Sequence, residues 1–168
     1  MVWEALSDVS HDAPLHVRLV GERAERGVRR QTITYDAGAG ARRAAFLLQP
    51  EAGTGPFAAA LFVHWYEPES PDSNRTQFLA ETERLAERGV VALLIETMWS
   101  DRDWFIKRTQ ADDERNTIAQ VTELRRALDL LLAQPGVDAR RCAYVGHDFG
   151  AMYGVLAGSI DPRPSCYV

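Results

Sequence analysis

The sequence predicts an α/β fold, in which a mostly parallel sheet is covered by helices and preceded by an antiparallel hairpin. Two apolar runs, FAAALFVHW (57–65) and VVALLIET (90–97), are typical of parallel strands that are buried on both faces, and helical patterns follow them. Residues 28–50 hold two strand patterns around the turn AGAG, and Pro50 closes the second. With 168 residues, 46% of them hydrophobic, the whole chain 1–168 is expected to form a single domain.

The elements follow in order along the chain. Residues 1–27 are weakly patterned, and only LHVRLV at 15–20 resembles a short strand. After the hairpin we expect parallel strands near 57–64, 90–96, 141–146 and 165–168. Helices are expected near 74–88, 112–134 and 149–158. Ser73 or Asn74 is the expected N-cap of the first helix, and Pro135 and Gly136 are expected to end the second.

Composition excludes several classes of function. The net charge is -5 and the basic residues are scattered among acidic ones, so we expect no nucleic-acid partner. No window approaches the ~18 apolar residues of a membrane span, and the N-terminus has no basic start, so a cytoplasmic protein is expected. Cys142 and Cys166 lie in apolar runs and are expected to be buried thiols. No Cys, His and carboxylate cluster has ligand spacing, so no metal or cofactor is predicted.

The segment YVGHDFGAMYG (144–154) ends a predicted strand in a tight turn and opens a helix. Gly146 and Gly150 flank Asp148 in the G-x-Nuc-x-G pattern of a nucleophile elbow, where the strained backbone leaves no room for neighbouring side chains. An aspartate carboxyl is ionised at neutral pH and needs no base before it attacks. The alternative is that Asp148 only caps the helix, because Asp is among the preferred N-cap residues.

With this elbow in place, residues 28–168 resemble the α/β-hydrolase superfamily. FVHWYEP (62–68) looks like the loop after that family's third strand, which normally reads His-Gly, although Trp65 stands where glycine is usual. The layout is most similar to dienelactone-hydrolase-type members, and GHDFG is similar to the elbow of haloalkane dehalogenases and epoxide hydrolases. The resemblance implies a hydrolase of a small ester, epoxide or halide, with Asp148 as nucleophile and the backbone N–H groups of Phe149 and Trp65 as oxyanion donors.

Other residues of this edge receive supporting roles. His64 ends a strand and is expected to position the oxyanion loop rather than to transfer protons, while His147 is expected to pack. Tyr66, Trp99 and Trp104 lie in the loops after the first two parallel strands, where they would line an apolar substrate pocket. The alternative is that these aromatic side chains only pack long loops onto the domain.

The pattern breaks off after the elbow helix. The four histidines, at 11, 16, 64 and 147, do not match the family's base position, and the late acid is missing too. We therefore expect a shortened hydrolase whose C-terminal strands are missing, with a non-catalytic relative that binds a small molecule or a partner chain as the alternative. A flavodoxin-like binding domain is disfavoured because no Gly-rich loop follows the first parallel strand. An exposed edge at the last strand favours association, including a homodimer.

Overall fold

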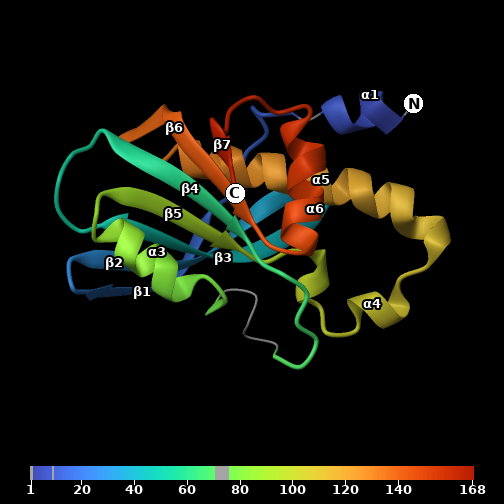
Figure 1. Cartoon of the computed structure of the whole chain (residues 1–168), viewed down its shortest axis with the longest axis horizontal. Coiled ribbons are helices and arrows are strands. Elements are labelled where there is room, and N and C mark those ends of the chain that lie inside the picture. The colour runs from blue at the N-terminus through green and yellow to red at the C-terminus, as the bar shows by residue number, and fades with distance from the viewer. Residues whose placement is uncertain (1, 9, 71–75) are drawn as a thin grey trace.

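A computed structural model of the chain describes residues 2–8, 10–70 and 76–168. In this part of the chain, seven strands form one sheet in the order β1-β2-β3-β5-β4-β6-β7 (Figure 1). The strands are β1 (Arg18–Glu25), β2 (Val28–Gly38), β3 (Ala41–Pro50), β4 (Phe57–Val63), β5 (Val90–Ile95), β6 (Val137–Gly146) and β7 (Cys166–Tyr167). The predicted α/β fold class is confirmed.

The pairing of the strands brings the carboxyl ends of β4, β5 and β6 to one edge of the sheet. The hairpin β2–β3 is antiparallel and joins β5 in antiparallel register, whereas β5, β4, β6 and β7 are parallel. Strand β4 lies between β5 and β6, so the chain crosses to one side of β4 and then to the other. Val63, at the end of β4, pairs with Ile95 and with Gly146. The carboxyl ends of three parallel strands therefore meet at a topological switch point, where open α/β sheets bind ligands.

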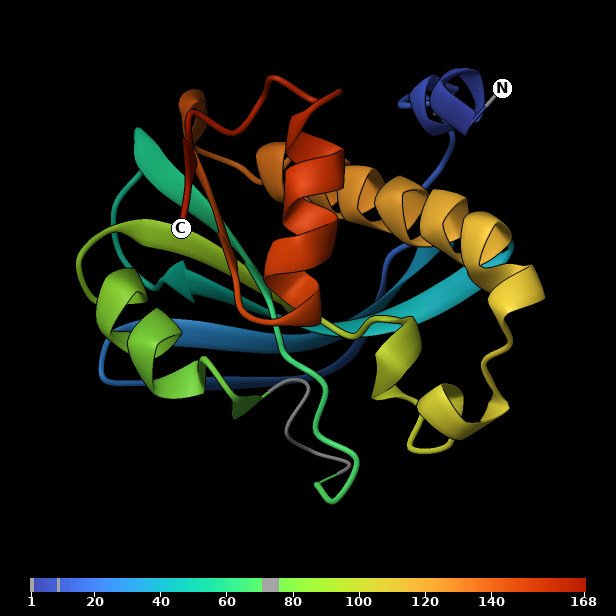
Figure 2. The same cartoon turned by 45° about the vertical axis from the view of Figure 1, so that its right-hand side comes forward.

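Helices cover both faces of the sheet (Figure 2). Ala59, Leu61 and Val63 of β4 belong to the core cluster that includes side chains of α5 (Asp113–Leu132) and α6 (Phe149–Gly158). Ala60 and Phe62 alternate with them and belong to the cluster that includes side chains of α3 (Leu79–Ala86). This alternation explains the unbroken apolar run of β4, because both faces of a parallel strand are buried. The shorter elements are α1 (Val2–Ser7), α4 (Trp104–Lys107) and the 3-10 turns η1 (Met98–Ser100) and η2 (Gln110–Asp112).

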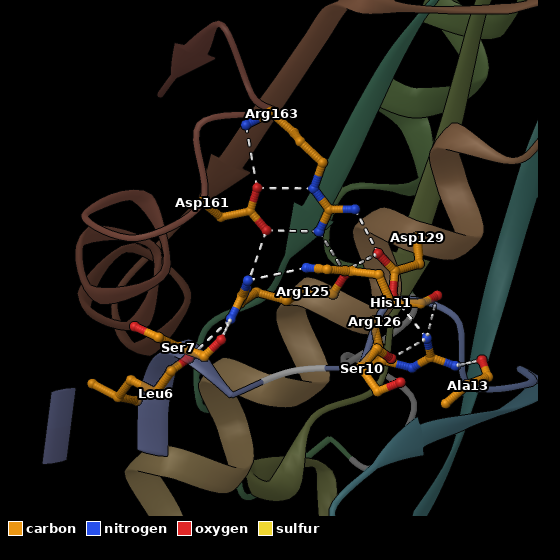
Figure 3. A network of polar contacts seen from close by, with 10 residues as sticks. All are labelled: Leu6, Ser7, Ser10, His11, Ala13, Arg125, Arg126, Asp129, Asp161 and Arg163. Atoms are coloured by element: carbon orange, nitrogen blue, oxygen red, sulfur yellow. Dashed lines mark hydrogen bonds and ion pairs between the residues drawn. The ribbon is translucent and has the colours of Figure 1, made fainter. Parts of the chain in front are cut away.

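A network of buried charges holds the N-terminal segment against α5 (Figure 3). Arg125 donates to the carbonyl of Leu6 at 2.9 Å and pairs with Asp161 at 3.3 Å. Arg163 also donates to Asp161, at 2.6 Å. Arg126 pairs with Asp129 and donates to the carbonyls of three more residues, Ser10, His11 and Ala13. Buried charges are tolerated when they are paired and hydrogen-bonded, as these are. The weakly patterned start is thus fixed by residues more than 100 positions away.

Some expectations about the ends of elements need correction. Cys166 is exposed because β7 lies at the sheet edge, so the prediction of a buried thiol is wrong there. Cys142 is buried as expected, and its burial raises the pKa of the thiol to about 11. The proposed N-caps Ser73 and Asn74 lie outside the described residues. Tyr167 and Val168 are exposed at the β7 edge, and the homodimer through this edge stays a prediction.

In the described part of the chain, no helix has both the length and the apolar character that crossing a bilayer requires.

Candidate active site

The turn between β6 and α6 has the strained backbone of an elbow. Asp148 adopts φ 53° and ψ -117°. A positive φ is uncommon for a residue other than glycine and costs of order 1–3 kcal/mol. A Cβ at Gly150 would lie 2.1 Å from the Val63 carbonyl oxygen, and one at Gly146 would lie 2.6 Å from the Gly150 carbonyl carbon. Both flanking positions therefore exclude side chains, for the reason that the motif predicts.

The side chain of Asp148 does not cap its own helix. Asp148 is the N-cap residue of α6, yet its carboxylate makes no capping hydrogen bond. Instead, Oδ2 accepts a long hydrogen bond from the backbone N–H of Tyr66, at 3.4 Å, in the loop after β4. The N–H of Phe149 lies at the first helical position, where a helix provides no backbone acceptor, and a helix N-terminus favours negative charge. The carboxylate is thus exposed at the switch point, beside the Tyr66 N–H and at the N-terminus of α6.

The donor in the loop after β4 is one residue later than the sequence suggests. The N–H of Trp65 donates to Oε1 of Gln77 at 2.9 Å, so it does not face Asp148. The Trp65 ring packs edge-on between Phe78 and His147, with ring centroids 5.7 and 5.2 Å away. Trp65 therefore anchors the loop, and Tyr66 presents the N–H. Gln77 was not identified from the sequence, because a glutamine in a helical pattern carries no distinctive signal.

His64 is buried beneath this loop, with 1% of its surface exposed. Its Nδ1 lies 2.6 Å from the carbonyl oxygen of Trp65 and 3.2 Å from Nε1 of Trp99. A carbonyl oxygen only accepts, so the shorter contact assigns the proton to Nδ1, and the Trp99 indole donates to the His64 carbonyl instead. Nε2 is then the acceptor, and it lies 3.0 Å from the Thr97 hydroxyl and 3.2 Å from the Ser100 hydroxyl.

Burial lowers the pKa of His64 from its ordinary value of 6.5 to about 4, although the hydrogen bond to the Trp65 carbonyl opposes the shift. The imidazole is therefore neutral at pH 7, and both of its nitrogens are engaged. This arrangement suits a structural support of the loop better than a group that takes a proton from water.

Aromatic side chains gather next to the elbow. Tyr66 is half-buried, and its ring centroid lies 6.1 Å from that of Phe149 and 6.4 Å from that of Trp104. Trp104 contacts Phe149 edge-on at 5.5 Å. Phe105, 50% exposed, lies 5.6 Å from Tyr66. The structure thus brings Tyr66 and Trp104 together beside the residue that follows Asp148.

Trp99 does not join this surface. Its side chain is 2% exposed, stacks on Tyr153 with centroids 5.3 Å apart, and donates from Nε1 to the His64 carbonyl at 3.2 Å. An indole buried in this way fills the core and cannot line an open pocket. Of the three aromatic residues expected to line the pocket, Trp99 does not take that place, because it lies in η1 with its side chain buried against Tyr153.

The other histidines are engaged or lie on the surface. Nδ1 of His11 contacts Asp129 at 2.7 Å, and Nδ1 of His16 contacts Asp36 at 2.7 Å. His147 is exposed and packs its ring against Trp65. Among the described residues, no group of three or more His, Cys, Asp or Glu side chains is placed to hold a metal ion.

Solved esterase structures share this architecture. An acetyl xylan esterase from a Paenibacillus species is 22% identical, with a TM-score of 0.72 over 98% of this chain and 55% of that chain. The chain has the α/β-hydrolase fold. An acetyl xylan esterase from a Thermoanaerobacterium species is 15% identical (TM-score 0.75; 99% of this chain, 55% of that chain). A glucuronoyl esterase from Solibacter usitatus is 14% identical (TM-score 0.69; 99% of this chain, 56% of that chain).

The chain thus spans about half the length of these α/β-hydrolase-fold structures. No protein-family model matches the sequence, and neither does any curated protein.

Proposed function

We propose that the chain carries the nucleophile of an α/β-hydrolase-type hydrolase, and that Asp148 attacks an electrophilic carbon of a small ester, epoxide or alkyl halide. The observation that carries this proposal is the elbow itself. Its backbone is strained at Asp148, yet the carboxylate makes no cap for α6 and accepts from the Tyr66 N–H across the switch point. A residue that only caps a helix requires neither a strained backbone nor a carboxylate that is turned away from that helix.

The first step is a displacement at carbon. An oxygen of the Asp148 carboxylate forms a bond to the carbon while the carbon–halogen bond breaks and halide leaves. With an epoxide, the ring C–O bond breaks, and the resulting alkoxide takes a proton from water. Both routes give an ester on Asp148. Because the nucleophile is already ionised, this step requires no general base.

The second step is hydrolysis of that ester. Water adds to the carbonyl carbon of the Asp148 ester, and the negative charge develops on the other Asp148 oxygen. Backbone donors that face Asp148 itself, as Tyr66 does and Phe149 is placed to do, would stabilise this charge. Cleavage of the bond to the alkyl oxygen releases the alcohol and restores the carboxylate. A base that activates the water typically contributes ~10² to 10⁴-fold.

We propose that no histidine of this chain serves as that base. Both ring nitrogens of His11 and of His64 are hydrogen-bonded. His16 is bonded to Asp36, and the ring of His147 packs edge-on against Trp65. We therefore propose that the ester persists on this chain.

Two features bear on the substrate. Tyr66 and Trp104 form an aromatic wall beside the elbow, which favours an apolar substituent on the reacting carbon. A dienelactone-hydrolase-like layout, which we propose for this chain, would fit a small substrate. The acetyl xylan and glucuronoyl esterases that share the fold support an ester as a further substrate class. Attack on an acyl ester would expel its alkoxide, which takes a proton from water, and leave a mixed anhydride on Asp148. An epoxide gives a stable alkyl ester.

The test uses the stable product. The folded chain is incubated with styrene oxide, digested, and its peptides weighed. We expect one stoichiometric adduct at Asp148 and little turnover, and the adduct should be absent from Asp148→Asn. Asp103→Asn, which removes another exposed carboxylate near this edge, is the matched control and should leave the adduct unchanged.

Three other outcomes would change the conclusion. Modification spread over many carboxylates, and unchanged in Asp148→Asn, would show that Asp148 is only a helix residue. Binding without any adduct would favour a non-catalytic binding domain. Rapid turnover without trapping would mean that another group of the chain serves as the base.

A further inference from the structure

We infer that Gln77 is a positioning residue of this site, and that Gln77 and His64 together fix the peptide that presents the Tyr66 N–H to Asp148. The inference rests on the proposed function, because it assigns a purpose to the donor that faces the nucleophile. It concerns a residue that never touches the reacting atoms and acts only through the backbone of Trp65.

The geometry of the peptide bond supplies the first step. In a trans peptide the C=O of one residue and the N–H of the next point in opposite directions. The Trp65 carbonyl accepts from His64 Nδ1 at 2.6 Å, and on the other side of the same peptide the Tyr66 N–H reaches Asp148 Oδ2 at 3.4 Å. The hydrogen bond from His64 therefore sets the direction in which the Tyr66 N–H points.

Gln77 holds the neighbouring peptide. Its Oε1 accepts the Trp65 N–H at 2.9 Å, and its Nε2 lies 3.5 Å from the Trp65 carbonyl oxygen, at the limit of a hydrogen bond. The peptides on both sides of the Trp65 Cα are thus fixed by side chains, one by Gln77 and the other by His64. Since only φ and ψ of Trp65 relate these two planes, both dihedrals are determined.

The loop after β5 completes the support. The hydroxyls of Thr97 and Ser100 lie within hydrogen-bonding distance of His64 Nε2, and Thr97 is fully buried. Donation to Nε2 selects the tautomer that carries its proton on Nδ1, which is the nitrogen facing the Trp65 carbonyl. Contacts from the loops after β4 and β5 therefore hold the His64 ring in place. They also restrict the orientation of the peptide that presents the Tyr66 N–H.

The main experiment reads the Tyr66 N–H directly. In the wild-type chain, the amide proton of Tyr66 should shift in NMR spectra as the Asp148 carboxylate is protonated, and Asp148→Asn should abolish that shift. Gln77→Met has a similar shape but no acceptor, and we expect it to remove at least half of the shift. Gln77→Glu keeps an oxygen at the same reach and should restore it. Gln31→Met, a glutamine on β2, is the control for loss of an amide elsewhere.

A kinetic measurement separates this inference from the proposed function. In protein already modified at Asp148, cleavage of the ester at alkaline pH passes through an oxyanion beside Tyr66. Gln77→Met should slow that cleavage by roughly tenfold or more, because losing one oxyanion donor costs 10²–10³-fold. Formation of the adduct should change much less, since the alkoxide of that step forms on the substrate and the Asp148 carboxyl loses its negative charge.

The outcomes are distinct. If the wild type forms no adduct, the proposed function fails, while the NMR comparison still decides the role of Gln77. If Gln77→Met keeps the full Tyr66 shift, or cleaves the ester at the wild-type rate, the positioning role is overturned. Urea unfolding of each variant shows whether the fold is intact, and a merely structural role would lower stability without separating the two kinetic steps.

Discussion

The buried His64 predicts a specific loss of stability in mild acid. Its pKa is about 4 in the folded chain, against 6.5 for an exposed histidine, because burial disfavours the charged form. Between these two values the unfolded chain binds more protons, so the free energy of unfolding falls as pH falls from about 6.5 to about 4. At about 1.36 kcal/mol per pKa unit, the full effect is about 3 kcal/mol, and about 2 kcal/mol of it falls between pH 7 and pH 5.

The assay is urea unfolding of the wild type and of His64→Asn at pH 7 and pH 5. The wild type should lose about 2 kcal/mol more than the variant over this interval, whereas the exposed control His147→Asn should behave as the wild type does. An equal loss in wild type and His64→Asn would refute the reasoning. If His64→Asn does not fold, NMR of the wild type decides, since a His64 ring that titrates near 6.5 would show that it is not held neutral.

Two further substitutions test the framework of the site by urea unfolding. Gly150→Ala places a methyl group 2.1 Å from the Val63 carbonyl oxygen, which is backbone and cannot move aside. We expect the free energy of unfolding to fall by more than about 3 kcal/mol. A fall of less than about 1 kcal/mol would contradict the packing of the elbow. Asp161→Asn leaves buried Arg125 and half-buried Arg163 without their shared carboxylate and should cost about 3–5 kcal/mol. Asp138→Asn, which breaks a pair with a 90% exposed Arg140, should stay within about 0.5 kcal/mol. Equal effects of the two Asp substitutions would mean that the buried network contributes no more than a surface pair.

The central part of the fold could be predicted because its signals are local. The parallel strands β4 and β5 are uninterrupted apolar runs, and the expected 57–64 and 90–96 agree closely with Phe57–Val63 and Val90–Ile95. The elbow helix, expected at 149–158, is Phe149–Gly158. Strand β1 was predicted only at its start, in LHVRLV at 15–20, because all residues of Arg18–Glu25 are exposed and the sequence shows no buried face there. Among the described strands, β1 pairs only with β2.

The position of the elbow could be predicted from the sequence, but the orientation of the groups around it could not. Asp148 and its flanking glycines follow from the motif, because the strain of the turn restricts which residues fit. Which N–H faces the carboxylate depends on peptide orientation in the loop after β4, and side chains from 12 and 33 residues away set that orientation. Trp99 lies in the loop after β5, as expected. The direction of its side chain is set by packing on Tyr153, which the sequence does not show, so it was assigned to the pocket.

The strained elbow and the rigid loop after β4 together hold Asp148 at a fixed distance from the Tyr66 N–H. Holding Asp148 at a positive φ costs of order 1–3 kcal/mol, and this conformation persists only where the surroundings leave no alternative. On one side, Gly150 packs against the Val63 backbone so closely that α6 cannot shift without breaking the end of β4. On the other, His64 and Gln77 hold the Trp65 backbone by both its carbonyl and its N–H. The first support rests on Val63, the last residue of β4, and the second includes His64, the residue that follows it. Asp148 and the Tyr66 N–H are therefore both positioned by contacts at the end of β4. The distance between them depends on the sheet rather than on either loop alone.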